Sequence, residues 1–178
     1  MPGSASTPKG LCMSERRIPD PTLMARLPLS VKGVEWAASL LAGLAHERAG
    51  EAWSPHQHLF HLVANENVFL SRLRQMLEED HPKFLRWDSE GFMKSNYTRE
   101  PGMDDLAGQL TDLRATGAEL LRGVKSEDWS RTATWPDGRV VDLAWVAERM
   151  LWHALNHFAA LLDIHGDLEP LQAKATQD

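Results

Sequence analysis

Apolar residues recur at helical spacing along four long segments of this chain. We expect helices over residues 30–48, 54–79, 103–124 and 142–166, because each segment repeats apolar side chains at positions i, i+3, i+4 and i+7. Helices with one apolar stripe bury that stripe against each other. The pattern therefore predicts an all-α protein with the architecture of a four-helix bundle.

The second of these helices has the clearest start signal in the chain. Ser54 is a favoured N-cap residue, Pro55 occupies the first helical position, and Gln57 stands where a capping box needs it. The first helix has a weaker signal, with Ser30 as its expected N-cap after Pro28. Both helices should begin at these residues.

The connections between the helices differ in length. Residues 80–102 are far more than the roughly 2–8 residues that usually join bundle helices, which predicts a crossover between the second and third helices. The Asp137-Gly138 pair predicts a short hairpin before the last helix. Asp142 should cap that helix, which we expect to end near Gly166.

Length and composition indicate one domain. The chain has 178 residues, of which 43% are hydrophobic, enough for a single sizeable core. We expect a flexible N-terminal arm over residues 1–20, a bundle domain over 21–170 and a tail over 171–178. No apolar run approaches the roughly 20 residues of a membrane span and no secretory signal is evident, so a cytoplasmic protein is expected, with no membrane partner.

Charge and cysteine content narrow the functional classes. A net charge of −6 without a basic block argues against nucleic acid as a partner. Cys12 is the single cysteine, which excludes an internal disulfide and a cysteine-based metal cluster. Any bound metal would therefore need histidine and carboxylate ligands.

The candidate chemistry lies in the last helix. His153 and His157 are four residues apart and so share one helix face, within an otherwise apolar segment. Each imidazole needs either a hydrogen-bond partner or a metal ion that both can hold. A zinc-protease motif is excluded because Ala154 stands where that motif needs glutamate.

The second helix carries further candidates. Glu66 falls in the middle of its apolar arc, where a carboxylate is costly unless it is paired, hydrogen-bonded or near a cation. It is therefore both a functional candidate and a candidate for a buried salt bridge. By helical periodicity, His58 is as good a core-facing histidine as His61.

The segment from Trp53 resembles the second-helix signature of the DinB/YfiT-like family, which is described as metal-dependent hydrolases. That signature has a Trp-Ser/Thr-Val/Pro start, a histidine eight residues after the tryptophan followed by Leu or Ile, and an acidic residue or histidine five positions further on. The His-x-x-x-His pair of the last helix is similar to the closing motif of the family, and the resemblance covers about residues 25–168. The signature positions here hold Trp53, Ser54, Pro55, His61, Leu62 and Glu66.

The resemblance implies a bundle whose second and third helices run parallel. It also implies that His61, His153 and His157 converge on one divalent transition metal, which favours His61 over His58. Three imidazoles do not identify the ion, since zinc, nickel, iron and manganese all accept them.

Three histidine ligands would leave an open coordination position, which is typical of a catalytic site. Water there would be activated for hydrolysis of a small-molecule substrate, and a low-molecular-weight thiol would be activated for S-transfer, as in some members of the family. Glu66 would accept a proton or orient a ligand histidine, while His58 and Asn65 would line the rim of the pocket. The alternative is a non-catalytic binding or dimerisation protein with a metal-free histidine cluster.

Two tryptophans lie on the outer face of the last helix. Trp145 and Trp152 are seven residues apart and point away from the expected core. Exposed tryptophans are usually covered, here by the hairpin loop, the N-terminal arm or a second copy of the chain. Among these, a homodimer is expected.

Overall fold

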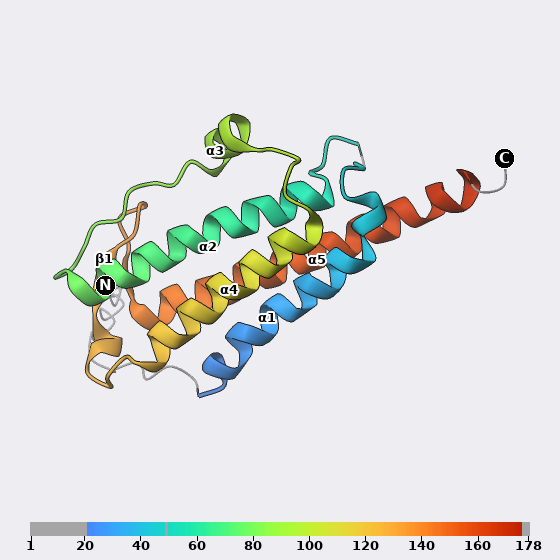
Figure 1. Cartoon of the computed structure of the whole chain (residues 1–178). Coiled ribbons are helices and arrows are strands. Elements are labelled where there is room, and N and C mark those ends of the chain that lie inside the picture. Colours follow the sequence, from blue (N-terminus) through green and yellow to red (C-terminus); the bar gives the residue numbers. More distant parts are fainter. Residues whose placement is uncertain (1–20, 49, 176–178) are drawn as a thin grey trace, which may run out of the picture.

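The computed structural model describes residues 21–48 and 50–175 and contains four long helices (Figure 1). A short helix lies between the second and third of them, a two-stranded sheet precedes the last, and two single turns of 3-10 helix occupy Ala42–Leu44 and Asp128–Ser130. The long helices are α1 (Pro21–Leu40), α2 (Pro55–Glu78), α4 (Met103–Arg122) and α5 (Leu143–Ala175); the short elements are α3 (Ser89–Asn96), β1 (Thr132–Thr134) and β2 (Val140–Asp142).

The helices form a bundle in which α2 and α4 run in the same direction, while α1 and α5 run in the opposite direction (Figure 1). Both α1 and α2 pack against α4 and α5. The connection that contains α3 returns along the length of α2 before α4 begins (Figure 1). The predicted four-helix bundle, its parallel pair and its long crossover are all confirmed.

The capping signals of α2 operate as the sequence predicts. The Ser54 hydroxyl accepts a hydrogen bond from the Gln57 backbone N–H at 3.3 Å, and the Gln57 side-chain oxygen accepts one from the Ser54 N–H at 3.0 Å. At the start of α5, the Asp142 carboxylate accepts from the Trp145 N–H at 2.7 Å. These bonds satisfy amide groups that a helix start otherwise leaves unpaired.

The expected start of the first helix at Ser30 is wrong. Helix α1 begins at Pro21, and Ser30 lies buried within it, where its hydroxyl donates to the Leu27 carbonyl at 2.7 Å. The apolar stripe continues upstream through Leu23 and Leu27, and burial of these side chains outweighs the local capping preference of Ser30. The helix also accommodates Pro28 in its interior.

The expected end of the last helix at Gly166 is also wrong. Helix α5 continues through this glycine to Ala175. A glycine costs a helix only about 1 kcal/mol relative to alanine, and a buried Leu168 follows it. One glycine is therefore too weak to end a helix that still has an apolar face to bury.

The predicted hairpin is present as the antiparallel pair β1 and β2, with Gly138 at a φ of 89° in its turn. Its strands contact the start of the crossover, where the Phe84 N–H donates to the Thr134 carbonyl at 2.9 Å. The Trp145 ring lies 4.9 Å from the Trp135 ring, centroid to centroid. The hairpin, one of the three expected covers, thus covers Trp145.

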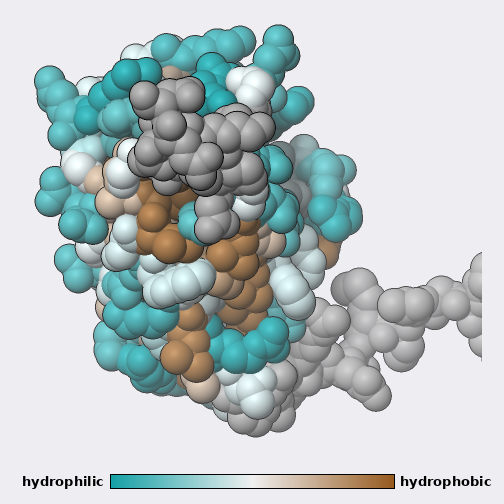
Figure 2. All heavy atoms as spheres, turned by 90° about the vertical axis from the view of Figure 1, so that its right-hand side faces the viewer, coloured by the Kyte–Doolittle hydropathy of each residue, from teal (hydrophilic) through white to brown (hydrophobic). Residues whose placement is uncertain are grey.

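Trp152 stays 52% exposed, with the Arg26 guanidinium 6.0 Å from its ring centroid. Figure 2 views the opposite end of the bundle from the hairpin, where hydrophobic side chains gather in the middle of the face. Leu40, the last residue of α1, is 42% exposed. A homodimer that covers Trp152 or the apolar end of the bundle stays a prediction.

The core consists of two apolar clusters separated by a polar layer. One cluster lies at the hairpin end and the other at the opposite end of the bundle. Along α2, Glu66 falls between Leu62 of one cluster and Phe69 of the other, and along α4, Arg114 falls between Leu110 and Leu121. The histidines of α5 belong to this same level of the bundle.

None of the described helices has the length and apolar character needed to cross a membrane.

Candidate metal centre

Three histidines from two helices meet in the polar layer. Helix α2 supplies His61, and α5 supplies His153 and His157 from adjacent turns. One ring nitrogen of each lies within 4.8 Å of the others, and Nε2 of His61 is 3.3 Å from Nε2 of His153. The convergence that the family resemblance implied is therefore present in the structure.

The separation of these nitrogens fits a shared ion. Two imidazole nitrogens at the usual zinc distance of about 2.0–2.1 Å, with a tetrahedral angle between them, are about 3.3 Å apart. Nε2 of His61 and Nε2 of His153 have this separation. The donor set also suits a borderline transition metal, since all three ligands are imidazoles.

Burial holds the three rings in the neutral form that a metal requires. Desolvation lowers the pKa of His61 to about 4, that of His153 to about 3 and that of His157 to about 2. Neighbouring imidazoles contribute to each of these shifts after burial, because their positive charges would repel. At neutral pH each ring therefore retains a lone pair for an ion.

These lowered pKa values predict acid sensitivity of the metal-free protein. An unfolded histidine takes up a proton near pH 6.5, whereas the folded rings resist it until about pH 4 or below, so the unfolded state gains stability as the pH falls through this window. Each such group contributes about 1 kcal/mol per pH unit. We expect the melting temperature of chelator-treated protein to fall steeply between pH 6.5 and 4.5, and less steeply in His157→Gln. Equal slopes for the two proteins would contradict this prediction.

A fourth histidine supports the cluster from the side. Nδ1 of His58 lies 2.8 Å from Nδ1 of His157, so that one ring donates and the other accepts. Burial lowers the pKa of His58 to about 4. This contact fixes the orientation of the His157 ring and leaves its Nε2 for an ion. Histidine ligands commonly have such a partner on their second nitrogen.

Asn65 lies one turn after His61 and contacts its ring. The amide nitrogen of Asn65 is 2.9 Å from Nε2 and 3.1 Å from Nδ1 of His61. An amide that donates to Nε2 competes with an ion for the same lone pair.

Glu66 lies in a different environment from the one a proton acceptor needs. Both of its carboxylate oxygens accept from Arg114, at 2.6 Å from Nε and 2.9 Å from Nη2. Arg114 also donates to the Ser30 hydroxyl and to the carbonyls of Leu27 and Met150, so the pair joins all four long helices. The structure thus shows the buried salt bridge that was one of the two expectations for Glu66. Its role as a proton acceptor or as a group that orients a ligand stays a prediction, which the ion pair disfavours.

A cavity of about 530 Å³ opens beside the histidines. His61, His153 and Asn65 line it, which places Asn65 at the pocket as expected. His58 instead lines a separate cavity of about 370 Å³ together with Trp53. The larger cavity is the one that a substrate could use to reach His61 and His153.

The individual residues in the remaining wall of this cavity were not predicted from the sequence, although part of the wall was expected from the long connection and the hairpin loop. Arg149 precedes His153 by four residues, and Arg72 follows His61 by eleven, so helical spacing could have placed both beside the histidines. Arg86 and Trp87 belong to the crossover, which has no periodicity to read. The other wall residues are Phe69, Ser89, Trp135, Pro136 and Asp137.

The fold and the histidine cluster define a class of helical-bundle protein with a candidate metal centre. Residues 34–161 match the DinB superfamily, and this match covers well over half of the chain. The chain therefore belongs to the DinB superfamily. No curated protein matches it.

The fold is also similar to the solved structure of YfiT from Bacillus subtilis. The two chains share 15% sequence identity with a TM-score of 0.75, over 94% of this chain and 95% of that chain. YfiT is described as a probable metal-dependent hydrolase with an unusual four-helix bundle topology. At this identity the likeness establishes the shared fold.

Proposed function

We propose that this protein is a metal-dependent enzyme that hydrolyses a small-molecule substrate, with His61, His153 and His157 as ligands of one divalent transition metal. The observation that carries the proposal is the meeting of three neutral, largely buried ring nitrogens within 4.8 Å of one another, with His61 and His153 at the wall of a cavity. Membership of the DinB superfamily and the fold of a probable metal-dependent hydrolase support it.

When bound at three histidines, a divalent ion supplies Lewis acidity and makes water or a thiol nucleophilic at neutral pH. The protein's own residues prepare the site for this chemistry. His61 and His153 present their nitrogens at the cavity wall, and His58 holds the His157 ring by the Nδ1 contact. The carboxylate of Glu66 is engaged by Arg114 and takes no part.

Turnover assays separate the candidate activities. Protein loaded in turn with zinc, nickel, iron or manganese is assayed against a panel of small esters and amides, with and without a low-molecular-weight thiol. We expect hydrolysis that requires the metal and is independent of thiol. Turnover that requires the thiol would show S-transfer instead. Protein that binds no metal after loading would favour the metal-free binding protein.

The contact between His58 and His157 makes a separate prediction. In His58→Ala the His157 ring loses its partner, and we expect metal affinity to fall by about 10- to 100-fold, the usual effect of removing such a partner. Affinity is measured by competition with a chelator of known metal affinity.

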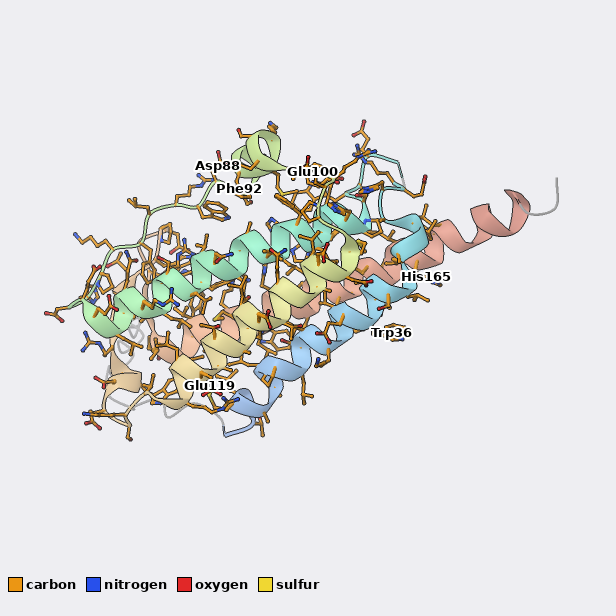
Figure 3. The ribbon with its side chains drawn as sticks, viewed as in Figure 1. Trp36, Asp88, Phe92, Glu100, Glu119 and His165 are labelled. Atoms are coloured by element: carbon orange, nitrogen blue, oxygen red, sulfur yellow. The ribbon has the colours of Figure 1, made fainter. Side chains whose placement is uncertain are left out.

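The matched control is His165→Ala. This histidine lies eight residues after His157, towards the far end of α5 (Figure 3), and is outside the cluster. Equal metal affinity in His58→Ala and wild-type protein would show that His58 does not position the ligand.

A further inference from the structure

The cavity beside the histidines is lined by three arginines and one carboxylate. Arg72 comes from α2, Arg86 from the crossover and Arg149 from α5. The carboxylate is Asp137, which is already paired: its Oδ2 accepts from Nε of Arg139 at 2.8 Å and lies 2.7 Å from Nη2. The cavity therefore presents an excess of positive charge.

Arg72 is the most telling of the three, because its side chain is largely buried and no acidic group among the described residues forms a salt bridge with it. Only 9% of it is exposed, and its one hydrogen bond among the described residues runs from Nη2 to the Leu85 carbonyl at 3.1 Å. Its guanidinium stacks 4.3 Å from the Trp135 ring centroid and 5.4 Å from that of Phe84. Burial lowers the pKa of Arg72, as expected for a cation short of compensating charge.

An arginine at a cavity wall whose unpaired nitrogens are not buried can bind an anion there. Its five N–H donors form a planar fork that matches the two oxygens of a carboxylate or phosphate. The ring contacts on Trp135 and Phe84 fix the plane of the fork, and four of its five donors have no protein acceptor among the described residues. Arg86 and Arg149 are exposed, and within the described chain neither forms a salt bridge.

Three aromatic side chains form part of the remaining wall. Phe69, Trp87 and Trp135 all line the same cavity. The indole N–H of Trp87 is the one buried side-chain donor in the described residues that lacks a partner. Flat apolar walls combined with cationic groups suit a molecule that carries both an apolar body and an anionic end.

We propose that the substrate carries an oxyanion group, a carboxylate or a phosphate, attached to a small apolar or aromatic body. Arg72 holds the oxyanion through its guanidinium, Arg86 and Arg149 add charge at the mouth, and the aromatic walls contact the body. The role of this molecule as a substrate rests on the proposed metal-dependent function. The anion site itself is built from residues that are not metal ligands.

Binding of simple probes to metal-free protein tests the site apart from the metal. Benzoate and phenyl phosphate serve as anionic probes, and benzyl alcohol as the neutral one, each titrated into chelator-treated protein by calorimetry. We expect at least one anion to bind at least tenfold more tightly than benzyl alcohol, with an affinity that falls as salt is added. The tighter of the two anions identifies the oxyanion. Equal affinity for all three probes would overturn the proposal.

Variants locate the site. Arg72→Gln should weaken binding of the preferred anion at least tenfold, while Arg86→Gln and Arg149→Gln, on exposed side chains that the fold does not need, should weaken it severalfold each. Arg122→Gln on the exposed face of α4 is the control and should bind as wild type does. If Arg72→Gln fails to fold, the two exposed variants decide, and wild-type affinity in both would overturn the proposal.

Because the titration uses metal-free protein, the two proposals can fail separately. Tight anion binding in a protein that takes up no metal would remove the hydrolytic function and keep the anion site. Metal uptake at the histidines without any preference for the anionic probes would remove the anion site and keep the metal centre.

Discussion

Arg114→Met should lower the free energy of unfolding by about 3–5 kcal/mol, which is a large part of the stability of a typical domain. Arg114 and Glu66 are each 1% exposed and form a two-bond ion pair. Methionine fills much of the arginine volume but leaves the Glu66 carboxylate buried without a counterion. Urea denaturation followed by circular dichroism measures the change.

Two further variants define the cause of this loss. Replacing both partners, with Glu66→Leu added to Arg114→Met, should restore most of the stability, because an apolar pair needs no compensation. Arg122→Met, on the exposed face of the same helix, should change stability by less than about 1 kcal/mol. A loss below 1 kcal/mol in Arg114→Met itself would contradict the structural role of the pair.

The second large effect concerns the ligands. His61→Ala, His153→Ala and His157→Ala should each reduce metal affinity by more than about 100-fold, since removing even an outer partner of a ligand costs 10- to 100-fold. The ratio of metal to protein after gel filtration should fall from near one to near zero. Elemental analysis of the filtered protein provides the measurement.

Two control variants accompany this series. His165→Ala removes an imidazole from the same helix as His153 and His157 and should retain a full complement of metal. The Glu66→Leu, Arg114→Met double variant should also retain it, because the ion pair does not contact the histidines through any hydrogen bond. Retention of metal in all three single-histidine variants would place the ion elsewhere in the protein.

Local signals predicted those elements whose ends depend on a few adjacent residues. The start of α2 follows from Ser54, Pro55 and Gln57, which satisfy each other's backbone groups without help from the rest of the fold. The prediction that α1 starts at Ser30 was wrong for the opposite reason. Ser30 is a good cap by composition, but packing of upstream Leu23 and Leu27 extended the helix past it.

The histidines of the candidate site were predictable only in part. The spacing of His153 and His157 placed them together by helix geometry, whereas the choice of His61 over His58 needed the family resemblance. The structure shows why periodicity could not decide, since both rings contact the cluster: His61 lies beside His153, and His58 lies behind His157.

The partner of Glu66 could not be found from the sequence. A carboxylate in an apolar arc signals a special environment, but it does not reveal whether a buried cation or a reaction is its cause. Arg114 lies 48 residues away along the chain and satisfies Glu66 only once α2 and α4 pack in parallel. The place of Arg86 in the crossover was equally hidden, because aperiodic segments give no face on which to place a side chain.

The most direct test of the metal centre is anomalous diffraction from crystals of metal-loaded protein, recorded at the absorption edge of the bound ion. We predict one ion, about 2.0–2.2 Å from a single ring nitrogen of each of His61, His153 and His157. An ion bound away from these residues, or three rings that contact only protein groups in fully loaded protein, would contradict it.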